Sequence, residues 1–146
     1  MARQTLSVVI PVYNVADIIG RCLDALTWAD EVGVVDMFST DETEAICRGY
    51  ANVRFFQNRD YIYANFNYGL DRATGDWILR LDSDEVVSPQ LAQEIQEEVL
   101  SKPEAPYAAY WVPNRMYFFG KWIRHGIAYD DRFGKDRIGY SHRLSL

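Results

Sequence analysis

The sequence predicts an α/β fold in which a mostly parallel central sheet is covered by helices on both faces. Short apolar runs rich in β-branched residues alternate with segments of helical periodicity along the chain. The first run, residues 6–12, is a continuous run rich in β-branched residues, which is typical of a strand buried on both faces. With 146 residues, 49% of them hydrophobic and 25% charged, the chain suits one globular domain. Repeated strand–helix–strand order favours parallel pairing through right-handed crossovers.

The first elements follow from this alternation. After the strand at 6–12, apolar positions from Ala16 onward recur at helical spacing, which predicts a helix. Residues 31–36 predict a second strand. Ser39 stands three residues before Glu42, a capping-box pattern that predicts the start of the next helix.

The middle of the chain continues the same order. Residues 52–56 predict a third, short strand, and residues 63–74 predict a helix. Gly75 stands just past that helix and is expected to cap its carboxyl end. Residues 77–81 predict the fourth strand, which is again apolar.

Beyond the fourth strand the pattern weakens. Ser88 followed by Pro89 predicts a helix start, because proline tolerates the first turn. Residues 107–112 alternate enough to predict a fifth strand. The rest, to residue 146, is aromatic and punctuated by glycine, and is expected to be irregular.

Charge is unevenly distributed within a net of −6. Residues 1–105 carry 8 Lys/Arg against 18 Asp/Glu, and residues 106–146 carry 7 against 3. The basic, aromatic tail predicts a second functional surface, whereas the acidic total argues against nucleic acid as a partner. Cys22 and Cys47 lack metal-ligand spacing and are expected to be buried thiols in a reducing, cytoplasmic compartment. No apolar run reaches the about 18 residues of a membrane span.

Polar residues interrupt three predicted strands at their carboxyl ends. Tyr13 and Asn14 follow the first strand, Asp36 ends the second, and Asp82 and Asp84 follow the fourth. In open α/β sheets, ligands bind outside the carboxyl ends of the strands. These residues therefore predict one binding crevice, although each alone is also compatible with an ordinary polar turn.

The acidic turn suggests the chemistry of the ligand. Asp82 and Asp84 form a D-x-D pair, and carboxylates this close favour a cation that neutralises them. Hard oxygen ligands favour Mg²⁺ or Mn²⁺, which usually bridges to substrate phosphates. Neither glycine-rich phosphate-binding motif is present, which argues against a dinucleotide dehydrogenase and a P-loop NTPase.

Taken in order, the motifs "SVVIPVYN", "VVDMFSTDET" and "ATGDWILRLDSDE" resemble the family 2 glycosyltransferases, which are inverting enzymes. The resemblance runs from about Leu6 to Arg143 and implies the Rossmann-like, GT-A type nucleotide-diphospho-sugar transferase fold. "NRMYFFGKWIRHG" further resembles the branch that builds lipopolysaccharide cores and related envelope glycans. Residues 1–105 would be the nucleotide-sugar-binding core, and 106–146 the start of an acceptor-side region of the same domain. The family's C-terminal part is expected to be lacking.

The resemblance also implies roles for single residues. Asp36 would contact the base or ribose of the nucleotide. Asp84 would bind the Mg²⁺ or Mn²⁺ ion, and Asp82 would face the ribose or share the metal. The nucleoside pocket would be lined by Pro11, Val12, Tyr13 and Asn14.

The implied reaction is metal-assisted transfer of a sugar, with inversion, from a nucleotide-diphospho-sugar to an envelope glycan or lipid-linked acceptor. The implied place is the cytoplasm, and a peripheral position at the inner face of the cytoplasmic membrane is left open. No residue matches the family's general base, so the catalytic residue is unknown. The candidates for this base in the tail are His125, Asp130 and Asp131, and each is also compatible with an ordinary polar loop or turn residue.

Two further features depart from a simple reading. Phe38 stands where the family commonly has glycine, so either the loop differs or Phe38 adopts a glycine-like φ. The tail aromatics either form an acceptor platform or pack on the sheet, and in the second case an exposed patch would favour self-association. The platform residues would be Trp111, Tyr117, Trp122 and Arg124.

Two other functions remain open from the sequence. "ILRLDSDEVV" fits the first motif of haloacid-dehalogenase-like phosphohydrolases, although that motif normally lies on the first strand. The second alternative is a truncated module that binds the donor but does not transfer the sugar. Phosphatase turnover would favour the first, and donor binding without transfer the second.

Overall fold

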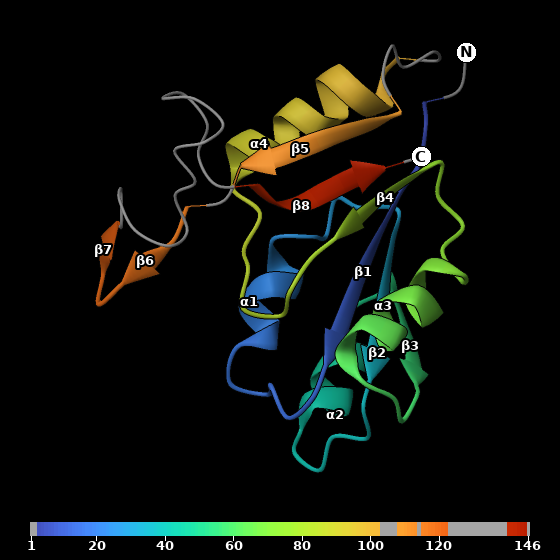
Figure 1. The fold of residues 1–146 in the computed structure, drawn as a ribbon, viewed down its shortest axis with the longest axis vertical. Helices are drawn as coiled ribbons and strands as arrows, with labels where there is room; N and C mark the ends of the chain where they lie inside the picture. Colours follow the sequence, from blue (N-terminus) through green and yellow to red (C-terminus); the bar gives the residue numbers. More distant parts are fainter. Residues whose placement is uncertain (1–2, 103–107, 114, 123–139, 146) are drawn as a thin grey trace.

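The computed structural model describes residues 3–102, 108–113, 115–122 and 140–145. Its main feature is a six-stranded sheet with the order β3-β2-β1-β4-β8-β5 (Figure 1). Its strands are β1 (Leu6–Val12), β2 (Glu31–Asp36), β3 (Val53–Gln57), β4 (Trp77–Arg80), β5 (Ala109–Pro113) and β8 (Tyr140–Ser145). The first four strands confirm the predicted ones to within one residue at each end.

The sheet is parallel in one half and antiparallel in the other. β1 pairs in parallel with β2 and with β4, and β2 pairs in parallel with β3. β8 runs antiparallel to both β4 and β5. The carboxyl ends of the four parallel strands therefore meet at one edge, as the sequence predicts.

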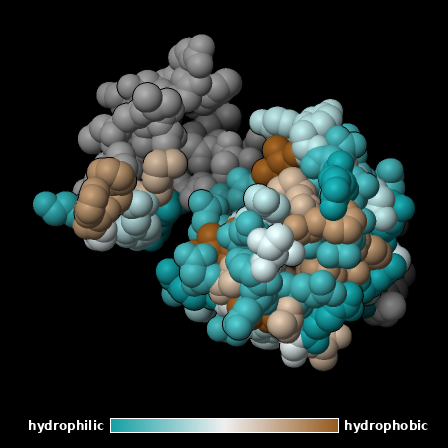
Figure 2. Space-filling model, turned by 90° about the horizontal axis from the view of Figure 1, so that it is seen from below, coloured by the Kyte–Doolittle hydropathy of each residue, from teal (hydrophilic) through white to brown (hydrophobic). Residues whose placement is uncertain are grey.

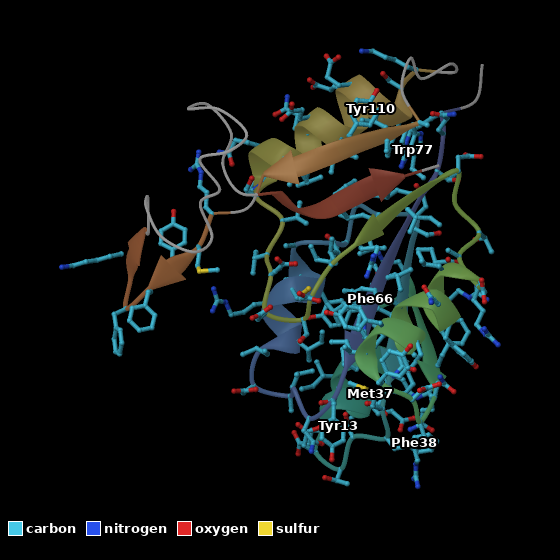
Figure 3. The ribbon with its side chains drawn as sticks, viewed as in Figure 1. Tyr13, Met37, Phe38, Phe66, Trp77 and Tyr110 are labelled. Carbon is cyan, nitrogen blue, oxygen red and sulfur yellow. The ribbon has the colours of Figure 1, made fainter. Side chains whose placement is uncertain are left out.

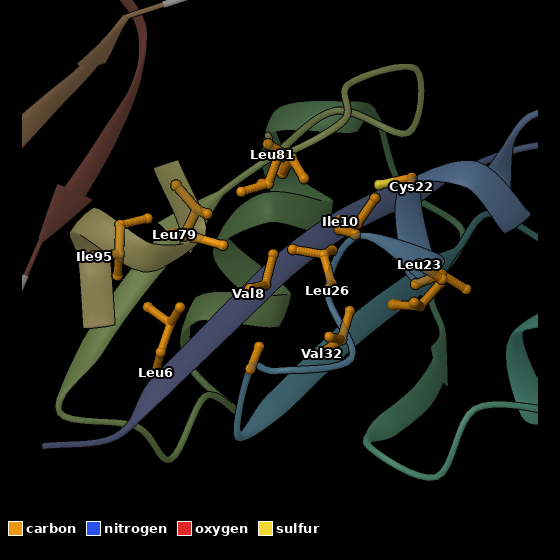
Figure 4. Close-up of a cluster of buried hydrophobic side chains, with 14 of the residues drawn as sticks. Leu6, Val8, Ile10, Cys22, Leu23, Leu26, Val32, Leu79, Leu81 and Ile95 are labelled. Carbon is orange, nitrogen blue, oxygen red and sulfur yellow. The ribbon is translucent and has the colours of Figure 1, made fainter. Parts of the chain in front are cut away.

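Helices cover both faces of the sheet. They are α1 (Ile19–Asp24), α2 (Thr43–Arg48), α3 (Ile62–Leu70), α4 (Pro89–Glu94) and a π-helical continuation of α4, η1 (Ile95–Leu100). On one face, Val8 and Ile10 of β1 belong to a buried cluster with residues of α1, α2, α4 and η1 (Figure 4). Ser88 caps α4 by accepting a hydrogen bond from the Leu91 N–H at 3.1 Å, with Pro89 in the first turn, as predicted.

The opposite face is covered by α3. A Cβ added at Gly69 would lie 2.4 Å from Cγ1 of Val9 and 3.1 Å from Cγ2 of Val35. Strand side chains alternate between the two faces, so Val9 points away from the cluster that contains Val8 and Ile10. The helix backbone thus touches the sheet directly at Gly69.

Two predicted helix signals are wrong. Ser39 does not cap α2, whose N-cap is Glu42 without a side-chain cap; Ser39 bonds Asp36 instead. Gly75 does not end α3, because the C-cap is Asp71. A Cβ at Gly75 would lie 2.6 Å from the backbone nitrogen of Ser7, so this glycine is needed for close approach to β1.

The tail is more regular than its sequence suggests. β6 (Tyr117–Phe118) and β7 (Lys121–Trp122) pair as an antiparallel hairpin, and residues 140–145 form β8. Figure 2 shows the hairpin apart from the main body, and Phe119 at its turn is 91% exposed. None of the described helices is long and apolar enough to cross a membrane.

Candidate functional site

An open pocket of about 450 Å³ lies at the carboxyl edge of the sheet. Three loops line it: Tyr13 follows β1, Met37 and Phe38 follow β2, and Arg59 and Asp60 follow β3. Figure 3 shows Tyr13, Met37 and Phe38 together at this end of the molecule. We call these five residues the loop pocket.

Phe38 has the backbone conformation of a glycine. Its φ is 61°, in the left-handed region, which costs a bulky residue of the order of 1–3 kcal/mol. The loop thus keeps its tight turn without a glycine. The ring is exposed enough to line the pocket, and the guanidinium carbon of Arg59 lies 4.6 Å from its centroid. This distance is within the range of a cation–π contact.

Asp36 holds the loop that carries Phe38. Its carboxylate is fully buried and accepts hydrogen bonds from the Ser39 N–H at 3.0 Å, from the Ser39 hydroxyl and from Nε2 of Gln57 at 3.2 Å. Burial, and then the negative charge of Asp36, raise the pKa of the Cys47 thiol to about 12. The buried Asp36 side chain therefore stabilises the loop that forms this wall of the pocket.

The loop after β1 is tied to the loop after β2. Asn14, with φ 49°, donates its N–H to the Ser39 hydroxyl oxygen at 2.8 Å and accepts from the Thr40 N–H at 2.8 Å. Met37 donates its N–H to the Val12 carbonyl oxygen at 2.9 Å. These bonds fix the two loops relative to each other and leave the Tyr13 side chain exposed.

Asn65 of α3 fixes the third loop of the pocket. Its buried amide donates to the Asp60 carbonyl oxygen at 2.8 Å and accepts from Nδ2 of Asn58 at 2.8 Å. Asn65, Arg59 and Asp60 are not among the site residues that the sequence predicts. The two pocket residues follow the carboxyl end of β3 closely, so the rule applied to the other strands would have found them.

The acidic turn, residues 82–85, follows β4 on the same edge. Asp84 is exposed and Asp82 is half-buried; the Glu85 carboxylate accepts the Asp82 N–H at 2.9 Å. The Cys22 thiol contacts the Asp82 carbonyl oxygen at 4.0 Å. Burial, and then the charges of Glu85 and Asp84, raise the pKa of this thiol to about 12. Both cysteines are free and buried, as predicted.

The structure places the other expected residues less directly. Pro11 and Val12 are buried within β1, and neither lines the loop pocket. Among the described residues, no group of three or more His, Cys, Asp or Glu side chains is placed to hold a metal ion. Tyr117 is exposed on the hairpin. The remaining tail candidates Arg124, His125, Asp130 and Asp131 lie outside the described residues.

Comparison with known proteins gives the family context. Residues 7–143 match the family model of Glycosyl transferase family 2. A PGL/p-HBAD biosynthesis glycosyltransferase of Mycobacterium bovis (strain BCG / Pasteur 1173P2) is 39% identical over 95 residues, covering 58% of this chain and 37% of the relative. The glycosyltransferase GlyG of Streptococcus pneumoniae serotype 4 is 27% identical over 109 residues, covering 68% and 36%. The chain thus spans well under half of these relatives' length.

Solved structures agree on the fold. The mannosyltransferase PcManGT from Pyrobaculum calidifontis, in complex with GDP-Man and Mn²⁺, has a TM-score of 0.61 at 25% identity and covers 78% of this chain and 37% of its own. S. aureus TarS 1-349 has a TM-score of 0.54 at 30% identity and covers 64% and 33%. The GT-A type fold expected from the motifs is confirmed. A phosphohydrolase is not favoured by these matches.

Proposed function

The chain belongs to glycosyl transferase family 2, and from that premise we propose that it binds the nucleotide-diphospho-sugar donor of a sugar-transfer reaction. The loop pocket would take the nucleoside, and the acidic turn would face the diphosphate. The donor sugar would then lie beside the acidic turn, on the side where β8 and β5 extend the sheet.

One observation supports this proposal above all others. The loop pocket and the acidic turn lie at the same edge of the sheet, at a separation that a nucleotide diphosphate can span. The loop pocket lies over β1, β2 and β3, whereas the acidic turn follows β4. From β3 to β4 the sheet crosses three strand spacings, about 14 Å in all. A ribose and a diphosphate have to bridge a span of this kind between a bound base and a bound cation.

The acidic turn fits a divalent cation. Asp82 and Asp84 offer hard carboxylate oxygens on a single turn after β4. Mg²⁺ and Mn²⁺ suit one or two carboxylates completed by substrate phosphates and water, so no third protein ligand is required. We assign Asp84 as the principal ligand and Asp82 as its partner or as a contact to the ribose. When bound, the ion neutralises the charge that develops on the departing diphosphate.

The pocket residues would act by binding and orienting the donor. Tyr13 offers an exposed aromatic face for the base, and Asp36 and Asn14 hold the loops that position it. The bond that breaks joins the anomeric carbon to the diphosphate, and the new bond joins the same carbon to an acceptor hydroxyl oxygen. Attack from the opposite face inverts the anomeric configuration. The acceptor hydroxyl gives its proton to a general base, and we assign that role to none of the described residues.

We further propose an envelope glycan or a lipid-linked molecule as acceptor. The β6–β7 hairpin exposes Tyr117, Phe118 and Phe119, and aromatic faces suit sugar rings. Arg115 and Lys121 flank these aromatics, which favours an anionic acceptor at the inner face of the cytoplasmic membrane. A lipopolysaccharide-core type of acceptor and self-association through this patch both rest on the sequence of the tail.

The test of donor binding is a thermal-shift screen of nucleoside diphosphates with and without Mn²⁺. At least one nucleotide is expected to raise the Tm of the wild type only when Mn²⁺ is present, because Asp84 would hold the ion that neutralises the diphosphate. Asp84→Ala is expected to abolish this shift. Asp71→Ala removes another exposed carboxylate, at the end of α3, and is expected to leave the shift unchanged. An equal shift in Asp84→Ala would remove the acidic turn from the site.

A further inference from the structure

Arg59 presents an unpaired guanidinium at the loop pocket. It makes no hydrogen bond and no ion pair within the described part of the chain, although it lines the pocket beside Asp60. Its guanidinium carbon lies 4.6 Å from the centroid of the Phe38 ring. Stacking therefore restrains the guanidinium while its N–H donors remain available to a ligand.

The Phe38 ring is held in place at a conformational cost. A left-handed φ is cheap for glycine, and uncommon and strained for a bulky aromatic residue. Such strain persists where the surrounding structure enforces it, and here Ser39 is bonded to Asp36 through both its N–H and its hydroxyl. The ring contacts Arg59 and lines the pocket, so its position serves that cation and the pocket rather than the buried core.

We propose that Phe38 and Arg59 form a unit that selects the base of the nucleotide. The inference rests on the proposed function and deepens it. Arg59 has only donors and the neighbouring Asp60 carboxylate only acceptors, so the two side chains match the carbonyl oxygen and adjacent N–H of uracil, thymine or guanine. Adenine has no carbonyl oxygen and presents an amino group where guanine has O6. The unit therefore favours keto bases over adenine.

A phosphate is the other acceptor that an arginine commonly binds, and the geometry disfavours it here. The Asp60 carboxylate borders the same pocket and would repel a phosphate, whereas it can accept the imide N–H that lies beside the carbonyl of uracil or guanine. The acidic turn that suits the diphosphate lies at the other side of β1, after β4. Arg59 is thus placed for the base end of the nucleotide.

The experiment measures Kd for UDP, GDP, TDP and ADP in the presence of Mn²⁺ by isothermal titration calorimetry, with inorganic pyrophosphate as a probe that lacks a base. The wild type is expected to bind at least one of the three keto nucleotides at least tenfold more tightly than ADP. Phe38→Gly suits the left-handed backbone and is expected to keep the Tm or raise it. It is nevertheless expected to reduce the preference over ADP to less than threefold and to leave pyrophosphate binding unchanged.

Arg59→Lys keeps the charge but loses the planar set of donors, and is expected to reduce the preference in the same way. The matched control is Arg72→Lys. The guanidinium carbon of Arg72 lies 3.4 Å from the centroid of the Tyr68 ring, and neither residue lines the pocket. Preference for ADP in the wild type, or an unchanged preference in both pocket variants, would overturn the inference while leaving donor binding intact. Failure of the wild type to bind any of the four nucleotides would overturn the proposed function and this inference together.

Discussion

Replacing Gly69 by alanine is expected to destabilise the protein, although alanine is the better helix former. The new methyl group would lie 2.4 Å from Cγ1 of Val9 and 3.1 Å from Cγ2 of Val35. Both contacts are with β-branched side chains of the sheet, which have little rotamer freedom to move away. The helix and the sheet must therefore separate locally.

The magnitude follows from two opposing terms. Overpacking a core site costs about 1–3 kcal/mol. The gain in helix propensity from glycine to alanine is at most about 1 kcal/mol, and less near the end of α3 where Gly69 lies. The net loss in the free energy of unfolding is about 1–2 kcal/mol. For a domain of this size it corresponds to a fall in Tm of about 2–8 °C.

The assay is urea denaturation followed by circular dichroism, with Gly20→Ala as a matched control. A Cβ at Gly20 of α1 would meet only the Tyr50 hydroxyl oxygen, at 3.9 Å, so this variant is expected to gain up to about 1 kcal/mol. Val9→Ala removes the closer of the two contacts at Gly69, so the added methyl group is expected to cost less in the double variant than it does alone. A Gly69→Ala protein as stable as the wild type would refute the direct contact between helix and sheet.

Further predictions concern the pocket loops and the thiols. Asn65→Ala removes both hydrogen bonds to the loop after β3 and is expected to lower the free energy of unfolding by about 2 kcal/mol in urea denaturation. The same variant is expected to weaken nucleotide binding at least fivefold. An unchanged Kd would show that the conformation of this loop does not depend on Asn65. Asp36→Asn places an amide donor where the carboxylate accepts hydrogen bonds from Ser39 and Gln57. It is expected to lower the free energy of unfolding by about 1–3 kcal/mol in urea denaturation, and no loss would contradict the stabilising role of Asp36. Cys22 and Cys47 have pKa values raised to about 12, so native protein is expected to resist iodoacetamide at pH 8 and to react only when unfolded. Because the unfolded thiols lose their protons from about pH 9 while the folded ones keep theirs toward 12, the free energy of unfolding should fall as pH rises across this window, and less steeply in Cys47→Ala; equal slopes would count against a buried thiol.

The parallel half of the fold was predictable because its signals are strong and local. The run at 6–12 is apolar except for Ser7, and the run at 31–36 is apolar between Glu31 and Asp36, so both patterns predict strands buried in a sheet. β8 was missed because residues 140–145 are polar and carry no such period. Its pairing with β4 and β5 depends on long-range contacts that no local pattern reports.

The candidate site shows the same division. The rule that ligands bind at the carboxyl ends of parallel strands predicted the edge of the sheet at which the site lies. It did not predict the hydrogen-bond partners of each side chain. Ser39 stands at the sequence position of a helix cap, yet its hydroxyl and its N–H both donate to the buried carboxylate of Asp36 instead. Gly75 has the position of a C-cap, yet the backbone at Ser7 is what excludes a side chain there. Both outcomes depend on residues brought together only by folding.

The order of strands in the sheet also has a consequence for how the protein is made. β4 pairs on one side with β1, but its partner on the other side is β8, about 65 residues further along the chain. During synthesis, that edge of β4 stays open until residue 145 has left the ribosome, and β5 waits for the same strand. An open strand edge invites pairing with another chain, so a ribosome that pauses between residues 113 and 140 exposes the nascent protein to aggregation.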